Sequence, residues 1–387
     1  MFITSGHFVN AYNDPQYYLF ATGIFCLSII FPWVQKNIAL PRVSFVGTPF
    51  LIVVIAYMTT QFGAFNSHWV NVLAVVMLIL LCIQLHHIEI NYQWVLGGLE
   101  GLGTALAIYG LLQYVGWIRD PTGFTMTGAF DNPIGFAATL ALMFPAGLYL
   151  FLTMNRDNNT SSTKRNNRKI YRYIEYLIGS GLAVISLAII LSGSRTAMLA
   201  VLVSSGLLVV LETKLIYWIK THVAYGEMVV LLCIIILLGG TIFGLYQLKE
   251  DSANGRLLIW RISTDMVIDR PLLGHGQGAF QAKYMDYQAA FFNKHPDSPF
   301  RQLADNTRHP FNEFILIAVE YGVIGLSFVL LFLFFLFRNI VLSNHPLRFI
   351  CISSLVGFLL ISCLSYPLQY VSVWLLVIFY AVLTTKT

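Results

Sequence analysis

The feature that most constrains this chain is a series of apolar stretches, each about as long as a helix that crosses a bilayer. Of its 387 residues, 57% are hydrophobic and only 11% are charged, whereas a soluble domain carries roughly 25% charged residues. So few charges cannot cover a water-facing surface of this size, which excludes a soluble enzyme, a secreted disulfide scaffold and a disordered protein. The sequence predicts an all-α, polytopic membrane helix bundle.

A helix needs about 20 apolar residues to cross the hydrocarbon core of a bilayer. We expect 11–12 transmembrane helices in a single integral membrane domain over residues 1–387, without internal repeats and without the alternation of a membrane barrel. Eleven stretches qualify: 17–34, 44–62, 68–85, 94–116, 133–154, 173–191, 196–212, 227–247, 313–337, 348–364 and 368–384.

The distribution of Lys and Arg predicts the orientation, because basic residues concentrate in the inside loops of membrane proteins. Residues 155–172 contain six Lys or Arg residues. With this segment inside, the first end of the chain lies outside and the last end inside, and the short outside loops keep only Arg119 and Arg195. All five cysteines lie in apolar stretches, and we expect neither disulfides nor metal ligands among them.

One outside loop, residues 248–312, is long and structured. Residues 256–270 predict an amphipathic helix, since Leu258, Ile262 and Met266 recur every four positions and Pro271 ends the pattern. A second amphipathic stretch covers 279–292. We expect both to lie on the membrane surface with their apolar faces down, and a structured loop of this kind suggests a site there.

Two arginines on the outside could bind an anion. Arg195 follows a Ser-Gly-Ser turn that opens a helix, where free backbone N–H groups would suit an anion. The alternative is an arginine that snorkels to the interface. Arg256 follows Asn254 and Gly255 at the expected start of the loop helix, where it is either a second anion-binding group or a solvated loop residue.

His309 is the candidate general base. Pro310 suits the first turn of a helix, and on that helix Glu313 and Glu320 would fall within about 40° of the His309 direction. A histidine backed by carboxylates can act near neutral pH, although a solvated loop histidine with ordinary capping acids fits the pattern as well. No histidine spacing typical of zinc occurs around His275 or His295, so we expect no metal. The role of Glu100, inside the stretch 94–116, stays open.

Three segments, taken in order and spacing, resemble the O-antigen ligase family. These are SGSRTAML (192–199), NGRLLIWRISTDMVIDRPLLGHGQGAF (254–280) and RHPFNEFILIAVEYGVIGL (308–326), and GAFDNPIGFAATLAL (128–142) is similar to a further family segment. The family includes O-antigen ligases, O-antigen polymerases and protein O-oligosaccharyltransferases. The resemblance covers roughly residues 120–330. Ligases of the family commonly have twelve spans, one more than is counted here.

The resemblance implies a bacterial inner-membrane glycosyltransferase that needs no metal or cofactor and whose active site faces the periplasm. It implies that Arg195 and Arg256 hold the pyrophosphate of an undecaprenyl-pyrophosphate-linked glycan and that His309 is the base; Arg308 and Glu313 complete the predicted substrate site. The acceptor would be a glycolipid (lipid A core), a growing glycan or a protein, with O-antigen ligase as the first reading and polymerase or protein transferase as the alternative. No nucleic acid is expected as a partner. A transporter or flippase of lipid-linked sugars is the alternative from a different class.

Overall fold

The apolar stretches form helices wherever the structure describes them. The computed structural model describes residues 92–120, 122–160, 168–213 and 250–383, and within these ranges every regular element is a helix and none is a strand. The elements are α4 (Tyr92–Tyr114), α5 (Pro133–Thr160), α6 (Arg168–Leu191), α7 (Arg195–Glu212), α10 (Glu250–Asp269), α11 (Ala279–Lys294), the 3₁₀ helix η1 (Pro299–Leu303), α12 (Glu313–Leu342), α13 (Arg348–Leu364), the 3₁₀ helix η2 (Pro367–Gln369) and α14 (Val371–Leu383).

Five described helices are long and apolar enough to cross a membrane: Tyr92–Tyr114, Pro133–Met154, Tyr171–Leu191, Arg195–Glu212 and Glu313–Leu342. They correspond to five of the predicted stretches. The predicted stretches 348–364 and 368–384 form shorter apolar helices, α13 and α14. The stretches 17–34, 44–62, 68–85 and 227–247 lie outside the described residues. The multi-pass membrane class is therefore confirmed for the described part of the chain, while the total of 11–12 spans stays a prediction.

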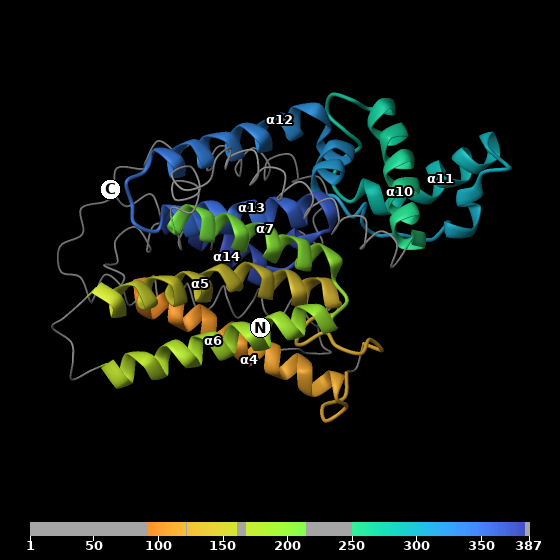
Figure 1. The fold of residues 1–387 in the computed structure, drawn as a ribbon. Coiled ribbons are helices and arrows are strands. Elements are labelled where there is room, and N and C mark those ends of the chain that lie inside the picture. Colours follow the sequence, from red (N-terminus) through yellow and green to blue (C-terminus); the bar gives the residue numbers. More distant parts are fainter. Residues whose placement is uncertain (1–91, 121, 161–167, 214–249, 384–387) are drawn as a thin grey trace, which may run out of the picture. The chain divides into compact units, whose positions relative to one another are not determined.

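The chain divides into two compact units. Among the described residues, the first unit comprises those within 92–209, 334–358 and 368–383, and the second comprises 210–213, 250–333 and 359–367. Within the first unit, α4, α5 and α6 pack against one another, and α14 packs against α5. Figure 1 shows that the α4–α5 connection and the α6–α7 turn lie at the same end of this unit. The predicted outside segments around Arg119 and Arg195 therefore share one end.

Small residues let the helices of the first unit approach closely. The Glu100 side chain is buried between α4, α5 and α6, beside Gly147 and Gly181, where an added Cβ would overlap it. Its Oε1 atom accepts a hydrogen bond of 2.9 Å from the Thr104 hydroxyl. Burial among packed helices favours a structural role for Glu100, because close packing and interhelical polar contacts hold membrane helices together.

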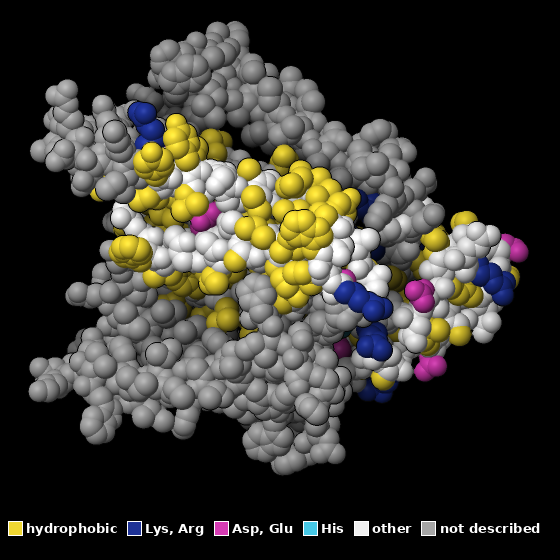
Figure 2. All heavy atoms as spheres, turned by 90° about the horizontal axis from the view of Figure 1, so that it is seen from below, with side chains coloured by type: hydrophobic (Ala, Val, Ile, Leu, Met, Phe, Trp, Pro, Cys, Tyr) yellow, Lys and Arg dark blue, Asp and Glu magenta, His cyan; other side chains and the backbone are white. Residues whose placement is uncertain are grey.

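The outer faces of α4 and α6 remain apolar and exposed. Trp94 is 81% exposed and Leu177 69% exposed, and Figure 2 shows a broad hydrophobic surface with few charged side chains. An apolar face of this extent is unfavourable in water and suits contact with lipid.

The second unit has its own hydrophobic core. The stripe of Leu258, Ile262 and Met266 on α10 is fully buried against Phe280 and Tyr284 of α11. The expectation that this apolar face lies down on the membrane is therefore wrong, because aromatic side chains of the neighbouring helix cover it. The loop helices form a packed protein layer that can position side chains.

Candidate active site

The loop leading into α12 carries His309, and the structure corrects its predicted relation to the helix. Asn312 caps α12: its Oδ1 atom accepts hydrogen bonds of 2.9 and 3.1 Å from the N–H groups two and three residues further on. The helix begins at Glu313, so His309 lies before it. The predicted common helical face of His309, Glu313 and Glu320 is therefore wrong, because Asn312 rather than Pro310 sets the start of the helix.

The His309 imidazole is held by a stacked aromatic ring. It lies nearly parallel to the Tyr366 ring, with centroids 4.6 Å apart and an interplanar angle of 23°. Burial, and secondarily the positive charge of Arg308, lower the pKa of His309 from 6.5 to about 4. The imidazole is consequently neutral at pH 7 and able to accept a proton.

A short chain of aromatic contacts links His309 to Arg256. The Phe311 ring meets Tyr366 edge-on at 5.3 Å, and the Arg256 guanidinium lies 5.2 Å from the centroid of the Phe311 ring. The Trp260 indole N–H donates a 2.8 Å hydrogen bond to the carbonyl of Pro310, the residue between His309 and Phe311. We call Arg256, Trp260, His309, Phe311 and Tyr366 the His309 cluster. It places two of the predicted site residues in one set of contacts.

Phe311 adopts an unfavourable backbone conformation. Its φ is 53°, and among the described residues it alone combines positive φ with a side chain other than hydrogen. Such a conformation costs on the order of 1–3 kcal/mol and is frequent at functional sites. The contacts of the His309 cluster hold the loop in this strained form.

Arg256 does not lie at a helix N-terminus as predicted. Helix α10 begins at Glu250 and runs through Asn254 and Gly255, since a glycine inside a helix costs only about 1 kcal/mol. A helix N-terminus therefore does not assist anion binding at Arg256. What remains is a half-buried guanidinium beside an aromatic ring.

A break in α12 anchors the loop. At Gly322 the backbone leaves the helical region (φ 67°, ψ −171°), and an added Cβ would overlap the carbonyl of Leu272. The freed backbone groups on both sides of the break bond to residues 271–276, including His275 N–H to Val319 carbonyl (2.9 Å) and Val323 N–H to Pro271 carbonyl (2.8 Å). The apolar stretch predicted at 313–337 is thus divided, and its first part belongs to the loop layer.

Two acidic residues of α12, Glu313 and Glu320, are buried in the protein. The Glu320 Oε1 atom accepts a 2.8 Å hydrogen bond from the N–H of Gly278, at the N-terminus of α11. This contact caps a helix whose N-cap glycine has no side chain to do so. Glu313, at the first position of α12, is only 3% exposed.

His275 is also explained by local structure. Its side chain is 1% exposed, and its Nε2 atom lies 2.8 Å from the carbonyl of Met266 at the end of α10. His295 instead lines a separate pocket of the same unit. Among the described residues, no three His, Cys, Asp or Glu side chains are grouped as metal ligands would be.

Arg195 belongs to the first unit. It is half-buried and is the first residue of α7. The preceding N–H groups are occupied: that of Ser192 bonds to Ala188, that of Gly193 to Ile190, and that of Ser194 to the Ser192 hydroxyl. The expected free N–H groups of the Ser-Gly-Ser turn are therefore absent, because the turn itself uses them.

Part of the chain is similar to a known protein family. The family model described as O-antigen ligase matches residues 180–330. This segment of the chain is similar to the O-antigen ligase family. The matched segment includes Arg195, Arg256 and His309, whereas Tyr366 lies beyond it.

Two curated relatives also resemble the chain. Proteins of Rickettsia conorii and Rickettsia prowazekii, each named "Putative polysaccharide ligase", are 26% identical over 142 residues and 28% identical over 141 residues. Each alignment covers 34% of this chain and 33% of the relative. The match thus spans about a third of the length of these relatives.

The sequence reasoning missed Trp260, Phe311 and Tyr366. The only local signal was Phe311 between Pro310 and the capping Asn312, a pattern typical of a constrained turn. Nothing in the sequence connects Tyr366 with His309, since their contact joins segments far apart in the chain.

Proposed function

We propose that the protein is a glycosyltransferase that moves a glycan from undecaprenyl pyrophosphate to an acceptor hydroxyl, with O-antigen ligase as the first assignment. The observation that carries the proposal is the His309 cluster, all of whose members except Tyr366 lie in the segment that resembles the O-antigen ligase family. The cluster combines a neutral, oriented imidazole with an arginine that is linked to it through two aromatic rings, Tyr366 and Phe311.

The reaction needs a base at the acceptor and positive charge at the leaving group. The acceptor hydroxyl attacks C1 of the donor sugar and loses its proton to the His309 imidazole. As the new C1–O bond forms, the bond between C1 and the pyrophosphate oxygen breaks, and the electron pair leaves with the lipid pyrophosphate. Attack opposite the leaving group inverts the configuration at C1.

Arginine suits the leaving group, because a guanidinium donates two parallel hydrogen bonds to phosphate oxygens. We assign Arg256 and Arg195 to the pyrophosphate. Arg308 is exposed beside His309 and can contact the donor or the acceptor sugar. Because Glu313 is buried, its part in substrate binding is to support the loop rather than to touch the sugar. No step requires a metal ion.

O-antigen ligases, O-antigen polymerases and protein transferases differ in the acceptor that receives the glycan. Lipid A core, a growing glycan and a protein hydroxyl would all use the same chemistry, so the first assignment is tested with each in turn. A polymerase extends a lipid-linked glycan, and a protein transferase modifies a serine or threonine.

The decisive test between enzyme and transporter uses purified protein in detergent, where no membrane separates two compartments. Given an undecaprenyl-pyrophosphate glycan and the three acceptors, the protein should form a glycosylated acceptor. A protein that makes no product with any acceptor but moves the lipid-linked glycan across the bilayer of a proteoliposome is a transporter.

A further inference from the structure

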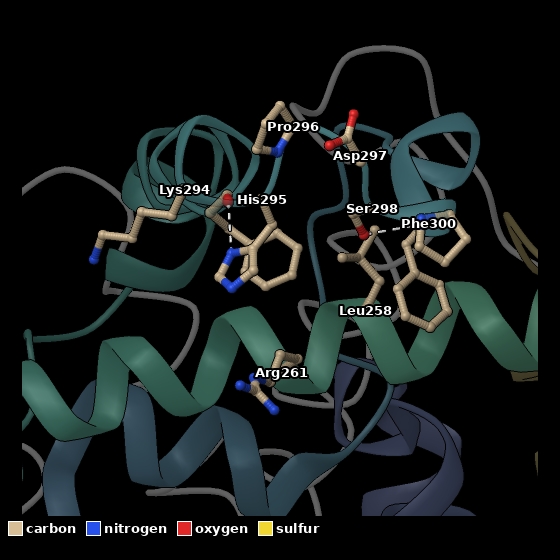
Figure 3. A pocket seen from close by; sticks show the side chains of 10 residues that line it. Leu258, Arg261, Lys294, His295, Pro296, Asp297, Ser298 and Phe300 are labelled. Carbon is tan, nitrogen blue, oxygen red and sulfur yellow. Dashed lines mark hydrogen bonds between the residues drawn. The ribbon is translucent and has the colours of Figure 1, made fainter.

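The second unit contains a pocket that shares no residue with the His309 cluster. Its volume is about 510 Å³, and it lies between α10, the end of α11 and the segment 295–300 (Figure 3). Pockets of roughly 300–1,000 Å³ hold small ligands. Arg261, which lines it, is five residues after Arg256 and therefore points about 140° away from it around α10.

The wall of this pocket is ordered by its own hydrogen bonds. The N–H of Ser298 donates to the His295 carbonyl (3.2 Å), and the N–H of Arg301 donates to the Ser298 carbonyl (3.1 Å). Pro296 and Pro299 fix two further backbone angles. A ligand would therefore meet a wall that needs little ordering, which preserves affinity.

The pocket offers flat aromatic surfaces over an apolar floor. The His295 imidazole stacks on the Phe291 ring, with centroids 4.8 Å apart and an interplanar angle of 23°. Figure 3 shows the His295 ring and the Phe300 ring on either side of the pocket, with Leu258 between them. Such rings suit the face of a pyranose, because its C–H bonds are attracted to the negative face of an aromatic ring.

The charges of the pocket favour an anion. Arg261 and Lys294 line it, and neither makes a hydrogen bond or ion pair with any residue in the described ranges. One acidic residue, Asp297, opposes these two cations, and Figure 3 shows its carboxylate directed away from Arg261. The two unpaired cations can donate charge-assisted hydrogen bonds to a carboxylate or phosphate.

We propose that this pocket binds an acidic saccharide unit, a hexuronate or a phosphorylated sugar, of the glycan that the protein transfers or of its acceptor. The proposal rests on the proposed glycosyl transfer and deepens it, since it places a second sugar-binding site on the loop layer. The rings hold the apolar face of the sugar, while Arg261 and Lys294 hold its acidic group.

The test measures binding to the full chain in detergent, independently of transfer. The probe is a tetrasaccharide of alternating glucuronic acid and N-acetylglucosamine, and its neutral counterpart is chitotetraose; both are followed by saturation-transfer NMR. Arg261→Gln combined with Lys294→Gln should weaken binding of the acidic probe about tenfold or more and leave the neutral one unchanged. Arg270→Gln, which removes an exposed charge near the end of α10 outside the pocket, is the matched control.

Three results would overturn the proposal: equal binding of the acidic probe to the double variant and the native protein, an equal loss in Arg270→Gln, or displacement of the probe by phosphatidylglycerol at the same concentration. The last result would assign the pocket to a lipid headgroup. Transfer by the native protein to a short acceptor is measured separately. Binding without any transfer refutes the proposed function and leaves the pocket assignment standing, whereas transfer with unchanged binding refutes only the pocket.

Discussion

Replacing Tyr366 with leucine should move the acidic limb of the pH–rate profile. In the native protein the pKa of His309 is about 4, first because the imidazole is buried and then because Arg308 is positively charged. The sequence alone suggested a limb near the ordinary histidine pKa of about 6.5. The structure instead predicts that kcat/KM stays constant as the pH falls to about 5 and declines only near pH 4.

The expected size follows from the same pKa. Removing the Tyr366 ring opens one face of the imidazole to water, so the pKa of His309 should rise toward 6.5, by up to about 2.5 pH units. At pH 5.5 the imidazole is about 97% neutral with a pKa of 4 and about 9% neutral with a pKa of 6.5. Relative to its own rate at pH 7.5, Tyr366→Leu should therefore lose up to about tenfold at pH 5.5, while the native enzyme loses almost nothing.

The assay is transfer in detergent from pH 4 to 8, with aliquots returned to pH 7.5 to exclude acid inactivation. Tyr366→Phe keeps the stacked ring and should keep the native limb. Arg308→Gln removes the smaller of the two causes of the low His309 pKa, and it should therefore move the acidic limb to higher pH by a smaller amount. The reasoning is refuted if the pH–rate profiles of the native protein and Tyr366→Leu have the same acidic limb, or if the native limb lies at pH 6.5. His309→Ala should lose about 10²–10⁴-fold in transfer rate at pH 7.5, and its remaining activity should show no acidic limb.

Three further predictions concern other parts of the account. Arg195→Lys and Arg256→Lys should each lower transfer about 10–100-fold at unchanged membrane insertion, because an ammonium cannot donate the two parallel hydrogen bonds of a guanidinium; native rates in both variants would remove the pyrophosphate role. Gly322→Ala should destabilise the protein by roughly 2–4 kcal/mol, measured by thermal unfolding in detergent, since its Cβ would overlap the Leu272 carbonyl at positive φ; Gly276→Ala, with positive φ but open space, should cost clearly less, and equal losses would contradict the packing argument. Transfer should continue undiminished in excess chelator, and a rate restored only by added Mg²⁺ or Mn²⁺ would show that a metal is required.

Helices whose identity depends on local pattern could be predicted from the sequence. The stretches 133–154, 196–212 and 348–364 closely match α5, α7 and α13, because long apolar runs bounded by turn residues leave few alternatives. The loop helix predicted at 256–270 also exists, although α10 begins at Glu250 because Gly255 does not stop it.

Errors arose where tertiary contacts decide the structure. The break at Gly322 depends on residues 271–276, which supply backbone partners from another part of the chain. The sequence offers two starts for α12, one with Pro310 in the first turn and one with Asn312 as the N-cap, and both patterns are compatible with a helix start. In the candidate site, His309 and Arg256 could be chosen from the sequence, whereas their connection through Phe311 and Tyr366 required the fold.

We propose that glycan transfer and release of lipid pyrophosphate are one reaction that depends on His309. The most direct measurement follows both products in the same detergent reaction, by mass spectrometry of the acceptor and of undecaprenyl pyrophosphate. We expect one released undecaprenyl pyrophosphate for each glycosylated acceptor, and loss of both products together in His309→Ala while donor binding persists. Native yields of both products in that variant, or acceptor modification without release of undecaprenyl pyrophosphate, would contradict it.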